Sequence, residues 1–440
     1  MNKRFKKIIL LLGDLLVLNL ALLFTLLLRY GSLSWSDNYR HHLPYFLVVF
    51  AIWLVFLYIS DLYNLNFAAP SKAFFKKVTS TLSLSLIFSV IYFYLNVNSS
   101  VTPRTNLLIF SGLFIVLFLI WRTSWQALNR SLQKNQLVII GNNQYSAKLQ
   151  QELQKNPGAG YELATIIKDT AELAEIVNLI KDKNIRTVVI CDDFGSSEQV
   201  QTALFACLAL NLSFYDYPSF YELLSGKVPV EAIGPDWFLN NLNEGNKNYF
   251  NFLKRLLDLL GASLLILILI PLFPLIALII KLESRGPVFF TQERYGRNEQ
   301  IFKILKFRTM RTTNNHGQPT STKDRRITPV GNFLRKTRLD ELPQAINIFR
   351  GEMSFIGPRP ERPELVKDLE LAIPFYKTRL LIKPGISGWD QVSGTYHSPS
   401  PEDTLEKLQY DLFYLKHRSL YLDLVITLKT IATVLGRGGR

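Results

Sequence analysis

Residues 259–280 have the sequence LLGASLLILILIPLFPLIALII, an apolar run that is long enough to span a bilayer. Pro271 and Pro274 interrupt its middle. Each proline lacks a backbone N–H and clashes with the preceding helical turn, so we expect a sharp break there. Basic residues lie at both ends, Lys254 before the run and Lys281 after it. We therefore predict a re-entrant hairpin that enters and leaves on the cytoplasmic face, with an ordinary span as the alternative.

Four further apolar runs in the first third of the chain are interpreted as membrane spans, near Ile8–Leu28, Leu43–Tyr63, Val78–Leu95 and Leu107–Trp121. Lys and Arg cluster before the first run and after the second and fourth runs, which predicts a cytoplasmic N-terminus and a cytoplasmic chain after the fourth run. The first run is about as long as a bilayer span and no cleavage site follows it, so we interpret it as a retained helix and not a signal peptide. Asp14 and Asn19 lie within it; a functional role is open, but we favour a structural role in bridging helices.

The formal net charge of +15 over 440 residues requires an anionic partner. Because membrane runs are present, we expect lipid phosphate and a nucleotide sugar, and no nucleic acid. The chain has two cysteines, Cys191 and Cys207, without metal-ligand spacing, and we predict that both are reduced thiols of a cytosolic domain.

From Gln136 the pattern changes to alternating strands and helices. Leu137–Ile140, Leu163–Ile167 and Thr187–Ile190 have the pattern of buried strands, which predicts a parallel, doubly wound sheet. The turn that begins at Gly141 lacks the further glycines of a dinucleotide-binding fingerprint. We favour a structural or regulatory module and keep nucleotide binding as the alternative.

Two adjacent carboxylates, Asp340 and Glu341, lie within the motif TRLDELPQ at residues 337–344. Proline is tolerated only in the first turn of a helix, so a helix that contains Pro343 should begin near Leu339 or Asp340. Carboxylates at such a point can hold Mg²⁺, and one of them can attack phosphorus. Capping of the helix is the alternative for an Asp-Glu pair taken alone.

Basic motifs surround this pair and favour the catalytic interpretation. The alternation at residues 306–308 predicts a strand that presents Lys306 and Arg308 on one face. The turn GPRPERP at residues 357–363 is stiffened by prolines, which holds Arg359 for bidentate contact with phosphate. A second constrained turn, KPGISG at residues 383–388, continues to Gln391. Together with the carboxylates, these motifs are typical of a site for a diphosphate and a metal.

The stretch from about Lys254 to Gly436 resembles the bacterial sugar transferases, the polyprenyl-phosphate hexose-1-phosphate transferases. The resemblance is carried by GPVFF (286–290), QER (292–294), KFRTM (306–310), RLDELPQ (338–344), GPRP (357–360) and KPG (383–385), which occur in the family's order. The four spans and the α/β module resemble the long subgroup of this family. The resemblance implies a catalytic Asp340–Glu341 dyad and a re-entrant membrane helix.

The expected architecture is a membrane protein with a four-helix transmembrane bundle (1–135), a doubly wound, Rossmann-like α/β module (136–245), and a re-entrant helix with a mostly α catalytic domain (246–440). The expected reaction transfers hexose-1-phosphate from a UDP-hexose to polyprenyl (undecaprenyl) phosphate through an aspartyl-phosphosugar intermediate, which initiates the synthesis of a lipid-linked glycan or exopolysaccharide. We expect a multi-pass protein of the bacterial inner membrane, with a cytoplasmic catalytic domain, and a homodimer.

The expected catalytic residues are Asp340 and Glu341, which would also bind Mg²⁺. The expected substrate-binding residues are Lys306, Arg308, Arg338, Arg359, Lys383 and Gln391. Two rivals remain. A lipid-phosphate phosphatase usually needs a histidine acid or base, and His316 and His397 lie in polar loops without such a motif. A membrane scaffold or regulator of polysaccharide assembly would have no need for the dyad.

Overall fold

A computed structural model describes residues 3–31, 35–60, 62–63, 72–96, 103–131, 135–169, 172, 175–191, 198–210, 212–242, 247–311, 324, 326–394 and 400–435. The chain forms two compact units, Met1–Phe220 and Tyr221–Arg440. The finer division at residues 135 and 245 stays a prediction.

The elements of the first unit are α1 (Lys3–Tyr30), α2 (Trp35–Ile59), α3 (Lys72–Leu95), α4 (Pro103–Ser131), β1 (Asn135–Ile140), α5 (Gln144–Lys155), η1 (Pro157–Ala159), β2 (Tyr161–Ile167), α7 (Ile176–Asp182), β3 (Ile185–Ile190), α8 (Glu198–Cys207), η3 (Leu208–Leu210) and β4 (Ser213–Asp216). The helix α9 (Tyr217–Ser225) leads into the second unit.

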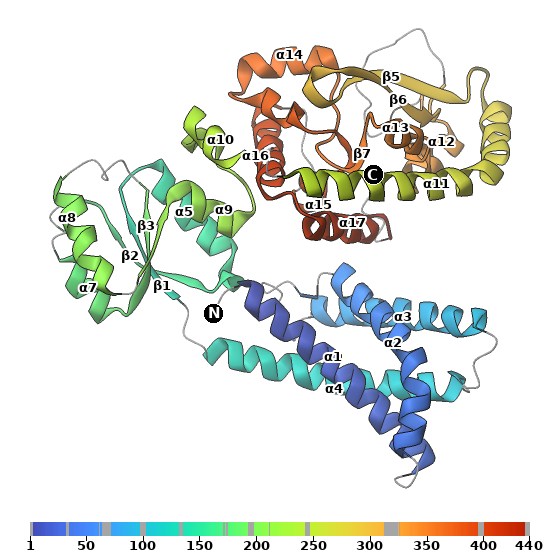
Figure 1. Cartoon of the computed structure of the whole chain (residues 1–440), viewed down its shortest axis with the longest axis horizontal. Helices are drawn as coiled ribbons and strands as arrows, with labels where there is room; N and C mark the ends of the chain where they lie inside the picture. The colour runs from blue at the N-terminus through green and yellow to red at the C-terminus, as the bar shows by residue number, and fades with distance from the viewer. Residues whose placement is uncertain are drawn as a thin grey trace. The chain divides into compact units, whose positions relative to one another are not determined.

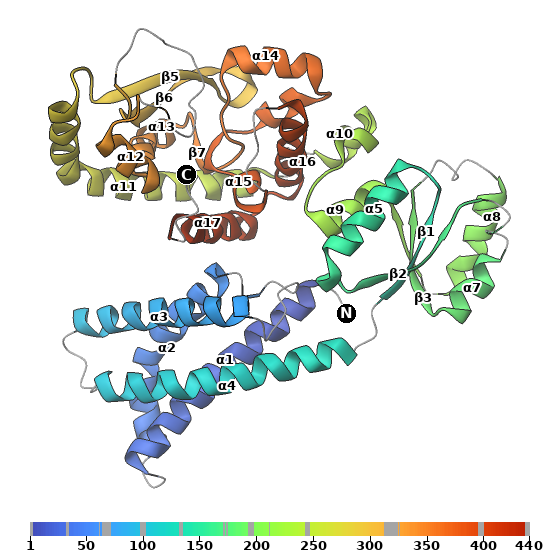
Figure 2. The same ribbon diagram turned by 180° about the vertical axis from the view of Figure 1, so that it is seen from behind.

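All four N-terminal apolar runs form helices, α1 to α4, and each is long and apolar enough to cross a membrane. The helix α1 packs between α2 and α4, as Figures 1 and 2 show. Aromatic rings fill the core of the bundle; Trp53 on α2 contacts Phe110 and Phe114 on α4 with ring centroids 5.2 and 4.8 Å apart. The predicted transmembrane bundle is confirmed as a set of helices.

The polar residues of α1 bridge helices, as predicted. The buried Asp14 Oδ2 lies 2.6 Å from Nη2 of the buried Arg122 on α4. Arg122 also donates to the carbonyl of Leu62, which follows α2. The hydroxyl of Tyr39 on α2 donates to Asn19 Oδ1 at 3.0 Å. Inside a bilayer such groups need partners from the protein, so these contacts hold the bundle together.

The predicted doubly wound sheet is confirmed, with parallel strands in the order β2-β1-β3-β4. Figures 1 and 2 show α5 and α9 on one face and α7 and α8 on the other. Asn143 caps α5 by accepting from the N–H of Ser146, whose hydroxyl accepts from the N–H of Asn143. The chain itself satisfies N–H groups at this helix end, which supports the structural interpretation over a phosphate site. Cys191 and Cys207 are buried free thiols, as predicted.

The elements of the second unit are η4 (Val230–Ala232), α10 (Pro235–Asn241), α11 (Asn248–Glu283), β5 (Phe289–Tyr295), η6 (Arg297–Glu299), β6 (Ile301–Phe307), α12 (Pro329–Lys336), η7 (Leu339–Glu341), α13 (Gln344–Arg350), β7 (Ser354–Ile356), α14 (Pro363–Ala372), η8 (Tyr376–Leu381), β8 (Gly385–Ser387), α15 (Trp389–Ser393), α16 (Pro401–His417) and α17 (Leu420–Leu435). Val228 and Val230, which precede α10, are buried with Val366 and Leu408 in its core.

The fifth apolar run forms α11, which contains Pro271 and Pro274 and bends sharply in its second half (Figure 1). Leu269 and Ile280 share one hydrophobic cluster with Phe307. In a straight helix Leu269 and Ile280 would lie about 16 Å apart along the axis, so the bend allows both side chains to pack in the same cluster. The predicted break is therefore a bend within a continuous helix. The cytoplasmic location of both ends stays a prediction.

Candidate active site

The Asp340–Glu341 dyad lies on the short 3₁₀ turn η7, between α12 and α13. Arg338 has a positive φ of 58°, a left-handed conformation that redirects the chain as α12 ends. Pro343 then caps α13, which begins at Gln344. The expectation of one helix beginning at Leu339 or Asp340 is therefore corrected to two elements, because the 3₁₀ turn closes before the proline and the α-helix starts after it.

Glu341 is the centre of a cluster of cations. Lys306 Nζ on β6 donates to Glu341 Oε1 at 2.8 Å. Arg338 Nη1 and Arg359 Nη2 lie 3.9 and 3.8 Å from the same oxygen. Although burial raises the pKa of Glu341, the charges of Lys306 and Arg359 outweigh it and hold the pKa at about 2. Glu341 is therefore ionised at any physiological pH.

Asp340 has a different electrostatic environment. It is buried, and its Oδ1 has no hydrogen-bond partner among the described residues. Burial, with a further contribution from the charge of Glu341, raises the pKa of Asp340 to about 6. The pKa values of these two adjacent carboxylates thus differ strongly. Asp340 has an oxygen without a hydrogen-bond partner in the described part of the chain and ionises near neutral pH.

Arg335 is a residue of this site that the motif analysis missed. Its Nε donates to Thr309 Oγ1 at 2.8 Å, and its charge opposes the rise in the pKa of Asp340. Arg335 lies in the last turn of α12, three residues before Arg338. That spacing in RKTRLDE was the available signal.

Two side-chain amide hydrogen bonds hold β6 beside the dyad. Asn347 on α13 accepts from the N–H of Leu305 at 3.1 Å and donates to the carbonyl of Lys303 at 2.8 Å. The strand β6 pairs with β5 in antiparallel register on its other side. Asn347 therefore hydrogen-bonds to the backbone at the edge of β6, as a neighbouring strand would, and holds in place the strand that carries Lys306.

Arg359 is positioned by a turn that is packed backbone against backbone. The N–H of Gly357 donates to Ser387, and the N–H of Gly385 donates to Pro358, both at 2.9 Å. An added Cβ at Gly385 would lie 2.1 Å from the backbone nitrogen of Gly357, so only glycine fits. The motifs GPRP and KPG are thus two sides of one close contact.

Two further arginines hold the same turn, Arg379, which is buried, and Arg294, which is partly buried. Arg379 donates to the carbonyl of Arg359 at 3.1 Å, and Arg294 donates to the carbonyl of Pro360 at 3.0 Å. Arg379 is itself fixed by Asp411, with Nη2 and Oδ2 2.8 Å apart. These contacts give Arg294 of the motif at residues 292–294 a positioning role, which its sequence alone did not reveal.

The other predicted substrate-binding residues lie elsewhere. The prediction of a strand that presents both Lys306 and Arg308 on one face is wrong for Arg308, because β6 ends at Phe307 and the Arg308 guanidinium donates to the carbonyl and hydroxyl of Ser284 at the end of α11. Lys383 lines a pocket with residues of α11. Gln391 lies on α15, and no described contact joins it to the dyad. Their roles in substrate binding stay predictions.

The carboxylate oxygens fit a divalent cation in part. Oδ1 of Asp340 is an unpartnered buried acceptor, whereas Oε1 of Glu341 already accepts from Lys306. Among the described residues there is no cluster of three or more His, Cys, Asp or Glu side chains for a metal. Asp340 is therefore the better ligand, and a bound Mg²⁺ would take its remaining ligands from water and substrate oxygens, as this ion usually does.

The comparisons with known proteins match both parts of the chain. A family model described as "Bacterial sugar transferase" matches residues 249–437, and one described as "CoA-binding domain" matches residues 58–215. The chain is 32% identical over 328 residues to a UDP-glucose:undecaprenyl-phosphate glucose-1-phosphate transferase of Escherichia coli, a match that covers 69% of this chain and 68% of that protein. The chain belongs to the bacterial sugar transferase family.

Two other relatives show how far the family likeness extends. The chain is 40% identical over 237 residues to a UDP-N-acetylgalactosamine-undecaprenyl-phosphate N-acetylgalactosaminephosphotransferase of Aeromonas hydrophila, and the match covers 53% of this chain and 55% of that protein. Exopolysaccharide production protein ExoY of Rhizobium meliloti is 39% identical over 203 residues, covering 42% of this chain and 87% of that protein. The chain thus spans only about half the length of the Aeromonas relative but most of the family member from Rhizobium.

Proposed function

We propose that this protein transfers hexose-1-phosphate from a UDP-hexose to polyprenyl phosphate, and so initiates the synthesis of a lipid-linked glycan or exopolysaccharide. One observation carries the proposal. Two adjacent carboxylates have divergent pKa values, about 6 for Asp340 and about 2 for Glu341, within a cluster of cations. Two relatives whose names state this reaction are 40% and 32% identical to the chain, over 237 and 328 residues.

In the proposed first step, an ionised Oδ of Asp340 attacks the phosphorus that bears the sugar. A bond forms between this oxygen and phosphorus, and the bond from phosphorus to the bridging oxygen breaks, so that UMP leaves with the electron pair. In the second step an oxygen of polyprenyl phosphate attacks the same phosphorus. The bond to Asp340 breaks, the carboxylate is restored, and the product is a lipid-linked diphosphosugar.

The cations have distinct tasks in this mechanism. Lys306 is committed to Glu341 at 2.8 Å and keeps that carboxylate ionised and fixed. Arg338 and Arg359 lie farther from Glu341, at 3.9 and 3.8 Å, and their side chains are 46% and 43% exposed. Their guanidinium groups are therefore the donors that contact the equatorial oxygens of the transferring phosphoryl group. A Mg²⁺ bound by Asp340 and the second oxygen of Glu341 would offset charge on the diphosphate.

The membrane places the two substrates at one surface. Five helices of the described chain are long and apolar enough to cross a membrane, so the protein is a multi-pass membrane protein. We infer a location in the inner membrane, with both ends of α11 and the dyad on the cytoplasmic side. A UDP-hexose reaches this side from the cytosol, and the acceptor's phosphate lies at the same surface. A homodimer is part of this proposal.

UMP release is the test, because neither a scaffold nor a lipid-phosphate phosphatase forms this product. The purified full-length protein is incubated with UDP-glucose, UDP-galactose and the corresponding N-acetylhexosamine donors, with and without undecaprenyl phosphate. With acceptor, sustained release is expected from one donor. Without acceptor, a burst of about one UMP per chain is expected from a covalent intermediate.

The two parts of the proposal fail separately in this assay. Sustained release with acceptor but no burst without it would leave the transfer reaction standing and reject the aspartyl intermediate. No release from any donor would reject the proposed function. His316 and His397, which bear on the phosphatase alternative, lie outside the described residues.

A further inference from the structure

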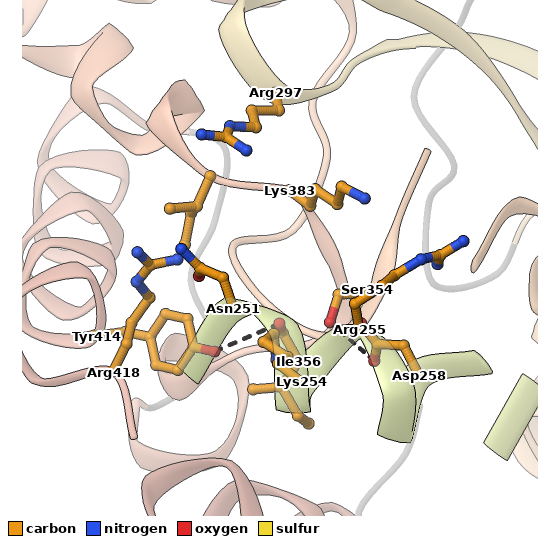
Figure 3. Close-up of a pocket in the computed structure, with 11 residues that line it drawn as sticks. Asn251, Lys254, Arg255, Asp258, Arg297, Ser354, Ile356, Lys383, Tyr414 and Arg418 are labelled. Carbon is orange, nitrogen blue, oxygen red and sulfur yellow. Dashed lines mark hydrogen bonds between the residues drawn. The ribbon is translucent and has the colours of Figure 1, made fainter. Parts of the chain in front are cut away.

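A basic pocket lies in the second unit, on the N-terminal half of α11 (Figure 3). The cavity has a volume of about 140 Å³ and is lined by five cations and one carboxylate, namely Lys254, Arg255, Arg297, Lys383, Arg418 and Asp258. Asn251, Lys254, Arg255 and Asp258 come from successive turns of α11, one face of the helix. In Figure 3, Arg297 and Lys383 lie on the opposite side of the cavity from α11.

The positive charge of this pocket is only partly balanced by the protein. Lys254 pairs with Asp423, with Nζ and Oδ2 2.6 Å apart. Arg255 donates to the carbonyls of Ile348 and Phe349, which are uncharged. The side chains of Arg297 and Lys383 make no hydrogen bond or ion pair in the part of the chain that the structure describes. Burial, and then the charge of Arg255, lower the pKa of Lys383, so these cations repel one another.

The pocket is separate from the dyad. Asp340 precedes α13, whereas Gly351 follows it, and an added Cβ at Gly351 would lie 3.3 Å from Arg255 Nη2 and 3.4 Å from Lys383 Nζ. The helix α13, which is 7 residues long, lies between Asp340 and Gly351 and accounts for a rise of roughly 10 Å. The cations that determine the pKa of Glu341 are Lys306, Arg359 and Arg338, none of which lines this pocket.

The size and surroundings of the pocket select its ligand. A volume of about 140 Å³ is well below the roughly 300–1,000 Å³ typical of sites for drug-sized ligands, so the pocket matches a phosphate group better than a whole nucleotide sugar. The other face of the same helix segment is apolar and exposed; Phe252, Leu257 and Leu260 are 67%, 55% and 61% exposed. A basic site on a helix whose other face is apolar and exposed suits a lipid headgroup at the membrane surface.

We propose that this pocket binds the phosphate monoester headgroup of a membrane lipid, as a second phosphate site distinct from the Asp340–Glu341 centre. The phosphate oxygens accept from Arg297 and Lys383, and the hydrocarbon chain passes beside α11 toward the membrane that the exposed apolar face of this helix contacts. This inference goes beyond the proposed transfer reaction and does not depend on which residue is the nucleophile.

The test is protection of Lys383 from acylation by an amine-reactive ester, read by mass spectrometry on the full-length protein. The protein is placed in nanodiscs of phosphatidylcholine alone, or with phosphatidic acid, or with phosphatidylglycerol as a phosphodiester of similar surface charge. With phosphatidic acid at about ten times its dissociation constant, acylation of Lys383 should slow by about tenfold. Lys367, an exposed lysine on α14, is the internal control and should react at the same rate in all nanodiscs. Arg297→Gln should weaken the protection.

Each other outcome overturns the proposal in a defined way. Equal rates for Lys383 with and without phosphatidic acid would show that the pocket holds no lipid phosphate. Equal protection by phosphatidylglycerol would reject recognition of a monoester. Protection by inorganic phosphate alone in phosphatidylcholine nanodiscs would reject the role of the lipid chain, and protection by UDP would assign the pocket to the nucleotide donor. No turnover is measured, so failure here is distinct from failure of the transfer reaction.

Discussion

Replacement of Asp340 by Asn should abolish transfer and at the same time stabilise the fold at alkaline pH. The side chain changes little in volume, but the buried site no longer holds a charge. The pKa of Asp340 rises from 3.8 to about 6 in the folded protein, and at 1.36 kcal/mol per pKa unit the ionised carboxylate costs the folded state about 3 kcal/mol. The Asn variant avoids this cost.

The sign of the pH dependence follows from the raised pKa. Well below pH 3.8 the carboxyl group is protonated in both the folded and the unfolded chain, so Asp340 carries no penalty. The penalty grows as the pH rises and is complete above about 6. The free energy of unfolding of Asp340→Asn should therefore exceed that of the wild type by about 3 kcal/mol at pH 8 and by about half as much at pH 5.

Urea unfolding at the two pH values measures this difference. The unfolding is monitored by hydrogen exchange in peptides of the second unit, with EDTA present. Asp368→Asn, at an exposed carboxylate of α14, is the matched control and should change neither stability nor UMP release. Addition of Mg²⁺ at pH 8 should stabilise the wild type but not Asp340→Asn. If the variant were no more stable than the wild type at pH 8, the raised pKa would be refuted. Substantial UMP release by the variant would refute the nucleophile.

Three further predictions concern the dyad, the membrane helix and the first unit. Lys306→Gln removes the lysine that donates to Glu341 at 2.8 Å and should lower kcat/KM by about 10²-fold, as loss of a positioned charge usually does. The control is Lys303→Gln, on the exposed side of the same strand. Equal losses of kcat/KM in both variants would contradict a special role for Lys306. Reporter fusions immediately before and after α11 should both give a cytoplasmic signal, and a periplasmic signal from the second fusion alone would establish an ordinary span. A chain that begins at Tyr221 should form product without the first unit, and one that begins at Asn248 should do so with lower stability; normal folding and donor binding without UMP release would implicate the missing residues.

The sequence determined the elements of this protein and the identity of its chemistry-bearing residues. Apolar runs of bilayer length located all five candidate membrane helices, and the pattern of apolar residues located three of the four strands of the parallel sheet but missed β4. These signals are local, because helix length and strand alternation depend only on neighbouring residues. The prolines of α11 likewise predicted its bend, since each acts on the turn that precedes it.

Tertiary structure alone decided which of the predicted cations act together. Lys306 and Arg308 are two residues apart, yet only Lys306 reaches Glu341, because the strand ends between them. Arg359 joins the dyad from a distant turn through the close contact of Gly357 with Gly385. The divergent pKa values of Asp340 and Glu341 depend on burial and on charges brought in from β6, α12 and the Arg359 turn. Contacts between residues far apart in the chain produce no periodic pattern in the sequence, so only the folded structure reveals them.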